Sequence, residues 1–167
     1  MTTTLLLPRS IIPSAMQLRI LDQRRLPAET TYLDCTTTDS VIEAIKTLAV
    51  RGAPAIGLAA AYGLLLGRTA GQGPDETLSQ FEAAASSLIA ARPTAVNLAW
   101  AVEHMMTCVR HEHRNAFREG WSNRLKAEAD QLFDADRQAC LTMGKIGAEL
   151  IPYGGRVLTH CNAGSLA

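Results

Sequence analysis

The chain lacks an excess of charge of either sign. Lys and Arg together number 16 among its 167 residues, and Asp and Glu also number 16, so the net charge is zero. Proteins that bind nucleic acid or an anionic membrane surface concentrate positive charge, so this balance argues against both kinds of partner. A small anionic ligand held by a few local groups remains compatible with the balance.

Several other signals are missing. The four cysteines form no CxxC pair, and the first residues lack the basic start of a signal peptide, with Pro8 and Arg9 interrupting their apolar run. The longest uncharged stretch lies between Arg51 and Arg68 and holds 16 residues. A membrane helix needs about 20. We therefore expect a cytoplasmic protein with reduced thiols, no disulfide, no metal site and no membrane partner.

The hydrophobic periodicity predicts a helix-rich chain with a small sheet. Residues 17–21 alternate polar and apolar side chains and residues 31–35 are rich in strand formers, so two strands with a turn between them are expected. Helices are expected from an N-cap at Asp39 or Ser40, with Glu43 completing a capping box, to Gly52, and then over about 55–66, 75–91, 94–109 and 122–150.

The same periodicity predicts which side chains face the core. The 55–66 helix is apolar all round and should be buried on every side. The inward residues expected on the next three helices are Leu78, Phe81, Leu88 and Ile89; then Val96, Trp100, Val102, Met106 and Val109; then Leu125, Ala129, Leu132, Asp136, Cys140, Met143, Gly147 and Leu150. Asp136 is the polar exception. Residues 111–121 are expected to be irregular, with His111-Glu112-His113 a solvated surface rather than a metal site.

The end of the chain is expected to form one more strand, at about 156–161, that enters a tight turn. A buried strand needs neighbours to take its backbone hydrogen bonds, and nothing later in the sequence supplies them.

Arg51-Gly52-Ala53-Pro54 combines a cation with the start of a helix. Free amides at a helix N-terminus attract anions, and an arginine fork beside them would complete a phosphate or carboxylate cradle. Arg92 stands before a second proline-initiated helix start, and two arginines could share a dianion. The alternative is that both junctions are structural turns.

Cys161 is the sharpest single candidate for chemistry. It stands where the last strand gives way to Asn162-Ala163-Gly164, and ligands bind beyond the carboxyl ends of strands in open α/β sheets. A cysteine near a helix N-terminus can serve as an acid, base or nucleophile. The alternative is a buried thiol that acts as a small apolar side chain, which is what we expect for Cys35, Cys108 and Cys140.

Three segments, 50–63, 92–98 and 158–164, together with 20–27 and 32–35, resemble successive signatures of the methylthioribose-1-phosphate isomerase family. The resemblance spans residues 20–166 and is weakest at 67–91 and 107–135. It implies interconversion of 5-methylthioribose 1-phosphate and 5-methylthioribulose 1-phosphate in methionine salvage, without metal or cofactor, by a homodimer. It places phosphate binding at Arg51, Gly52, Ala53 and Arg92, and catalysis at Cys161.

The resemblance also implies a second, Rossmann-like domain that carries a catalytic aspartate and further phosphate ligands, none of which this sequence contains. We therefore expect an α+β fold. Residues 1–151 would form a domain of short antiparallel sheet and helical bundle, and residues 152–167 the first strand of a truncated Rossmann-like domain. Such a chain should be an incomplete, inactive part of the enzyme. Ribose-1,5-bisphosphate isomerase, a non-catalytic initiation factor 2B-like regulatory protein, and a degenerate product that binds another chain remain alternatives.

Overall fold

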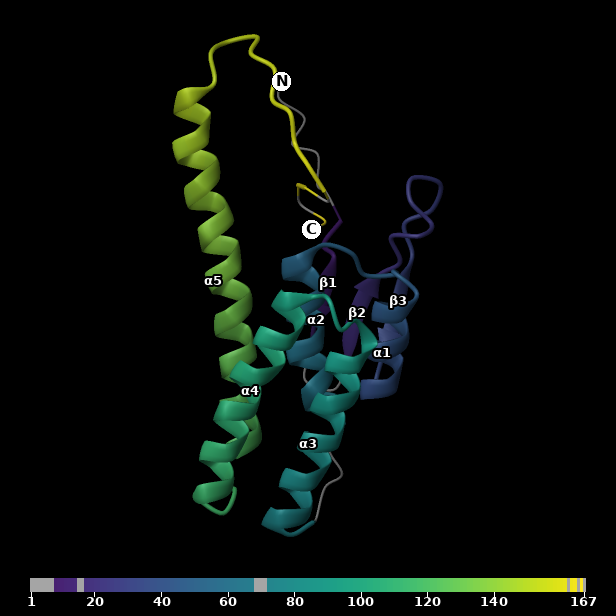
Figure 1. The fold of residues 1–167 in the computed structure, drawn as a ribbon, viewed down its shortest axis with the longest axis vertical. Coiled ribbons are helices and arrows are strands. Elements are labelled where there is room, and N and C mark those ends of the chain that lie inside the picture. Colours follow the sequence, from purple (N-terminus) through teal and green to yellow (C-terminus); the bar gives the residue numbers. More distant parts are fainter. Residues whose placement is uncertain (1–7, 15–16, 68–71, 162, 165, 167) are drawn as a thin grey trace.

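The computed structural model describes residues 8–14, 17–67, 72–161, 163, 164 and 166 (Figure 1). Their elements, in chain order, are the strands β1 (Ile11–Pro13), β2 (Leu18–Leu21) and β3 (Tyr32–Cys35) and the helices α1 (Thr38–Lys46), α2 (Ala53–Leu66), α3 (Pro74–Ala91), α4 (Val96–Arg114) and α5 (Trp121–Leu150). A small antiparallel sheet followed by helices is the α+β arrangement that was predicted for this part of the chain. None of the helices in the described ranges is long and apolar enough to cross a bilayer.

The sheet has the order β1-β2-β3, with both neighbouring pairs antiparallel. Ile20 in the central strand pairs with Ile11 on one side and Leu33 on the other. The strands predicted at 17–21 and 31–35 are therefore confirmed. Strand β1 was missed because it holds only three residues and ends in Pro13, too short a run to display alternation.

Helix α1 begins at a different cap from the one predicted. Thr37 is the N-cap: its hydroxyl accepts a hydrogen bond from the Ser40 amide at 3.2 Å, and the Ser40 hydroxyl accepts one from the Thr37 amide. The capping box thus uses a serine in place of Glu43. The helix also ends at Lys46, well before Gly52, because Leu48 adopts a left-handed conformation with φ of 61°.

Helix α2 occupies the centre of the helical layer. It packs against α1, α3, α4 and α5 and against the sheet, as Figure 1 shows, and ten of its residues are buried. This confirms the burial predicted from its apolar composition. Two glycines permit the close approach: a Cβ at Gly63 would lie 2.8 Å from Val41 Cγ1, and a Cβ at Gly57 would lie 2.8 Å from the Asn97 carbonyl oxygen.

The core predicted for α3 and α4 is only partly right. Phe81, Leu88, Val102, Met106 and Val109 are buried, whereas Leu78 and Ile89 are half-buried. Val96 and Trp100 were predicted to face inward but are 78% and 58% exposed, because they lie in the first turns of α4 at the edge of the helical layer. The predicted irregular segment is also wrong in part, since α4 continues through His111 and His113 to Arg114.

Helix α5 has a buried and an exposed half. Leu125 and Ala129 are buried and Leu132 and Asp136 are half-buried. Beyond them the predicted inward stripe is exposed at Cys140, Met143 and Leu150, and Gly147 is half-buried. Figure 1 shows the reason, because the C-terminal half of α5 extends past the other helices. Cys140 is therefore not a core cysteine, whereas Cys35 is buried and Cys108 half-buried.

Candidate functional site

The first arginine junction lies at the N-terminus of α2. Gly52 is the N-cap residue, with φ of 96°, a conformation that glycine adopts without the strain a Cβ would bring. No side chain caps this helix end, and Arg51 and Ala53 are exposed. The first amides of α2 and the Arg51 side chain are thus accessible, and anion binding at this junction stays a prediction.

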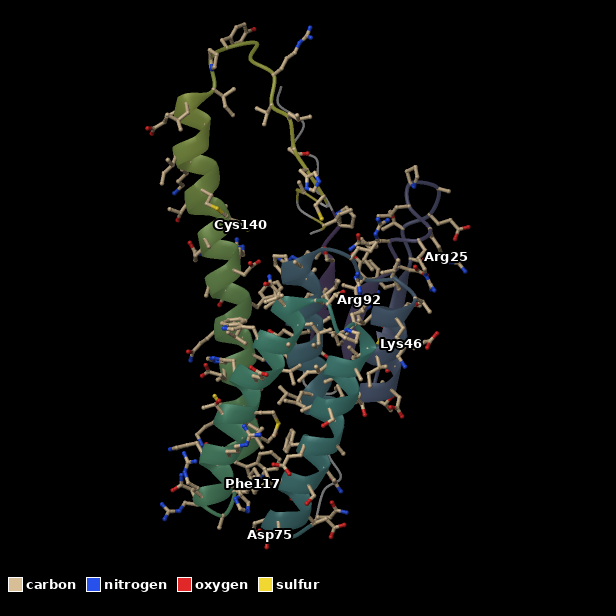
Figure 2. The ribbon with its side chains drawn as sticks, viewed as in Figure 1. Arg25, Lys46, Asp75, Arg92, Phe117 and Cys140 are labelled. Carbon is tan, nitrogen blue, oxygen red and sulfur yellow. The ribbon has the colours of Figure 1, made fainter. Side chains whose placement is uncertain are left out.

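The second junction connects α3 to α4. Arg92 is the half-buried C-cap residue of α3, and it lies in the connection that precedes α4 (Figure 2). Helix α4 begins later than predicted, at Val96 with Ala95 as its N-cap, because residues 92–95 form a turn closed by a hydrogen bond from the Ala95 amide to the Arg92 carbonyl oxygen. This helix end also has no side-chain cap.

Helix packing brings the two junctions to the same end of the molecule. Gly57 lies in the second turn of α2 and contacts Asn97, which lies in the first turn of α4. The N-termini of both helices therefore lie side by side. Within the described ranges, neither Arg51 nor Arg92 forms an ion pair or a side-chain hydrogen bond. Arg51 directly precedes the uncapped N-terminus of α2, whereas Arg92 lies at the C-terminus of α3, four residues before α4 begins.

The end of the chain returns to this region. The Leu166 carbonyl oxygen accepts hydrogen bonds from Ser10 Oγ at 2.9 Å and from Gln23 Nε2 at 3.0 Å. The same side-chain nitrogen of Gln23 lies 3.5 Å from the Arg51 carbonyl oxygen. The backbone N–H of Gln23 donates a hydrogen bond to the Ala49 carbonyl oxygen at 2.9 Å. Buried Gln23 thus links Leu166 to the Arg51 junction.

Gln23 was not predicted as a site residue. The only signal in the sequence was its place in the segment 20–27, whose resemblance to the isomerase family indicated a strand. Its role in joining distant segments depends on two hydrogen bonds to residues far along the chain, which no local pattern reports.

Cys161 is exposed and has a left-handed backbone, with φ of 63°. The strand predicted over 156–161 is not formed: residues 156–160 run as exposed chain without strand pairing. The reason is the one that made this strand anomalous in the sequence, namely that no strand among the described residues takes its backbone hydrogen bonds. Asn162, the next residue of the motif, lies outside the described residues.

A concave surface lies beside this region, between α5, α2 and β1. It encloses about 650 Å³, and its lining includes Ser10, Ala55, Leu58, Asp136 and Gly164. Asp136 also lines a neighbouring cavity of about 290 Å³ that includes Gly57 and Trp100. Burial raises the pKa of the Asp136 carboxyl. The polar exception on the predicted stripe of α5 therefore faces two hollows next to the arginine junctions.

Residues 49–167 match the model of the Initiation factor 2 subunit family. The chain belongs to this family. A methylthioribose-1-phosphate isomerase from Anaeromyxobacter sp. (strain K) is 48% identical over 149 residues, which make up 89% of this chain and 40% of the relative. A protein of the same name from Pelotomaculum thermopropionicum is 49% identical over 153 residues, or 90% of this chain and 42% of the relative.

Two solved structures have the same fold over nearly the whole chain. The 5-methylthioribose 1-phosphate isomerase from Pyrococcus horikoshii superimposes with a TM-score of 0.88 at 40% identity, covering 96% of this chain and 45% of that one. The translation initiation factor eIF-2B subunit delta from A. fulgidus superimposes with a TM-score of 0.78 at 37% identity, covering 95% and 46%. The chain spans less than half the length of these relatives.

Proposed function

We propose that this chain supplies the phosphate-binding arginines and one acid/base group of an aldose–ketose isomerase. The enzyme would interconvert 5-methylthioribose 1-phosphate and 5-methylthioribulose 1-phosphate in methionine salvage. The observation that supports the proposal best is the pair of uncapped helix N-termini with Arg51 and Arg92 nearby, neither of which is paired within the described residues. The relatives named methylthioribose-1-phosphate isomerase support it as well. A cytoplasmic homodimer belongs to the same proposal.

The reaction requires such residue types. The anomeric carbon of the substrate carries a phosphate, so the ring must open before hydrogen moves between C2 and C1. A dianion must be held firmly while this happens, and arginine forks with helix amides meet that need. In the proposal Arg51, Gly52, Ala53 and Arg92 bind the phosphate, and the Cys161 thiol exchanges a proton with the sugar.

The second acid/base group and the domain boundary at 151/152 are part of the proposal. Residues 152–167 would form the first strand and turn of a Rossmann-like domain, and a carboxylate from that domain would complete the proton transfer. Isomerase activity is therefore to be measured on the complete gene product, because this chain spans less than half of the isomerase relatives.

Cys161→Ser tests the proposed catalytic role. Loss of a positioned acid/base group should lower kcat by about 10²- to 10⁴-fold. Cys140→Ser, which removes an exposed thiol on α5, is the matched control and should leave turnover unchanged. Equal rates for both variants would remove Cys161 from the mechanism.

Arg92→Ala tests whether Arg92 binds the substrate phosphate. Charge-assisted hydrogen bonds are worth about 1.5–3 kcal/mol, so the affinity for phosphorylated substrate should fall by about 10- to 100-fold. Arg110→Ala, which removes an exposed cation further along α4, is the control. An unchanged Kd in Arg92→Ala would refute the assignment.

The structural likeness to the eIF-2B delta subunit supports a second candidate, a regulatory protein that acts by contact with other proteins. A substrate panel separates the candidates. Turnover of 5-methylthioribose 1-phosphate supports the first proposal, and turnover of ribose 1,5-bisphosphate alone supports the neighbouring isomerase. Failure of both sugars to react with the protein or to raise its Tm would favour the regulatory role.

A further inference from the structure

A group of three metal-ligating side chains lies apart from the arginine junctions, on α4 and α5. It consists of His104, Cys108 and Glu128, whose ligand atoms all lie within 4.8 Å of one another. His104 Nε2 and Glu128 Oε1 form a hydrogen bond of 2.6 Å. All three residues are half-buried, which partly desolvates the donors while leaving them room to move.

The two donors on α4 share one face of the helix. His104 and Cys108 are four residues apart, the spacing that stacks side chains one turn above another and lets them bind one ion. The third donor comes from α5, so an ion held by all three would join the two helices.

The packing of the two helices fixes the position of the third donor. Glu112, one turn after Cys108, receives two hydrogen bonds from Arg124 at 2.8 and 2.6 Å and is buried. The two helices run antiparallel. Cys108 lies one turn before Glu112 on α4, and Glu128 lies one turn after Arg124 on α5, so Cys108 and Glu128 face each other as Glu112 and Arg124 do. The Glu112–Arg124 pair therefore sets the register that brings Glu128 to the cysteine, and it also neutralises the arginine charge nearby.

The geometry lies close to that of a zinc site. Zn–N, Zn–O and Zn–S bonds of about 2.0–2.3 Å at tetrahedral angles place ligand atoms about 3.3–3.6 Å apart. The hydrogen-bonded pair, 2.6 Å apart, must open by about 1 Å. The Cys108 sulfur lies within 4.8 Å of both partners, and side-chain rotation can bring it to bonding distance. A cavity of about 370 Å³ borders two of the three donors, Cys108 and Glu128, and its lining also includes Arg114 and Arg124.

We propose that His104, Cys108 and Glu128 bind a single Zn²⁺ ion that cross-links α4 and α5, with water as the fourth ligand. A nitrogen, thiolate and carboxylate set suits this borderline-soft cation. Binding releases the Cys108 thiol proton to solvent, and the proton between His104 Nε2 and Glu128 Oε1 leaves for solvent or for His104 Nδ1, so that Nε2 can bind the ion. No metal site was expected from the sequence, and this site lies outside the isomerase chemistry, so its test is independent of that activity.

Zinc titration of the metal-free protein tests the site. The wild-type protein should bind one Zn²⁺ per chain, and zinc should raise its Tm because the folded state alone presents all three ligands. Removal of an outer hydrogen-bonding partner of a metal site costs about 10- to 100-fold in affinity, so Cys108→Ser, His104→Gln and Glu128→Gln should each lose at least as much. Cys140→Ser should bind zinc as the wild type does.

Cobalt substitution identifies the thiolate. Co²⁺ should give a thiolate charge-transfer absorption that Cys108→Ser abolishes and that Cys161→Ser keeps. Circular dichroism of the metal-free variants checks folding, and Glu128→Gln still decides the matter if Cys108→Ser unfolds. The proposal is overturned by an absence of zinc binding, by wild-type affinity in Cys108→Ser and Glu128→Gln, or by a cobalt band that depends on Cys161.

Discussion

Substitution of Gly57 by alanine would force apart the two helices that carry the arginine junctions. The new Cβ would lie 2.8 Å from the Asn97 carbonyl oxygen and 3.3 Å from its carbonyl carbon. Both contacts are to backbone, which no rotamer change relieves, so α2 and α4 must separate locally. Because Arg51 and Arg92 precede these helices, the same shift should move the two cations relative to each other.

The expected loss of stability is the difference between two effects. Overpacking a well-packed site costs about 1–3 kcal/mol, and a backbone obstacle places this site in the upper part of that range. Alanine recovers about 1 kcal/mol of helix propensity over glycine. The net destabilisation should be about 1–2 kcal/mol, or about 2–8 °C in Tm for a chain of this size.

Gly144→Ala on α5 is the matched control, because a Cβ there meets nothing within 4 Å. It should gain the helix-propensity term alone and raise the Tm. Urea unfolding of both variants measures the free energies, and a phosphate titration measures whether Gly57→Ala also weakens anion binding. If Gly57→Ala were as stable as Gly144→Ala, the close packing of α2 on α4 would be refuted.

Three further predictions concern the fold around the site. Thr37→Ala removes the α1 capping box and should cost about 1 kcal/mol in urea unfolding, and a change below a few tenths would contradict the cap. Tyr62→Phe removes the 2.8 Å hydrogen bond to Asp130 and should cost about 1 kcal/mol; burial and Asp130 raise the pKa of Tyr62, so its phenol should stay protonated in alkaline titrations until the protein unfolds. The Arg24 fork lowers the pKa of the buried Asp22 carboxyl, so its contribution should be complete above the unfolded value of about 3.9 and vanish as the pH falls through the folded value. Asp22→Asn should cost about 1–3 kcal/mol at neutral pH and flatten the acid limb of the stability profile, whereas an unchanged acid limb would contradict the pairing.

The sequence predicted correctly the features that depend on the residues of a single segment. The uniformly apolar 55–66 segment can only be buried, and α2 is. Gly52 takes the positive φ that its place before a helix suggested. The alternation at 17–21 gave the central strand, because one face of that strand packs on the helices. In each case the residues themselves carry the constraint.

Periodicity identifies one face of a helix but not the neighbour that would cover it. Trp100 lies on the expected helical spacing, yet it is 58% exposed, and the described part of α5 next to it leaves a cavity of about 290 Å³ between them. Cys140 and Met143 lie on the same face of α5 as the buried Leu125. They too are exposed, because this half of α5 extends past the other helices. The predicted last strand failed for the same reason, since a strand exists only where another strand accepts its hydrogen bonds.

The histidines on α4 show how spacing and packing together decide where a metal can bind. His111 and His113 are two residues apart, so on a helix they point roughly 200° away from each other and cannot share an ion. In the structure His113 Nε2 lies 2.8 Å from Asp75 Oδ1, and the Glu112 between the two histidines accepts a hydrogen bond from Arg124. His104 and Cys108 are four residues apart and share one face of the helix, as their spacing in the sequence indicates.

The third donor could not be predicted from spacing, because Glu128 reaches them only through the antiparallel register of α5 on α4. Two donors four residues apart on a helix therefore become a candidate metal site only when a neighbouring element supplies a third, and in this protein the buried Glu112–Arg124 pair fixes the register that supplies it.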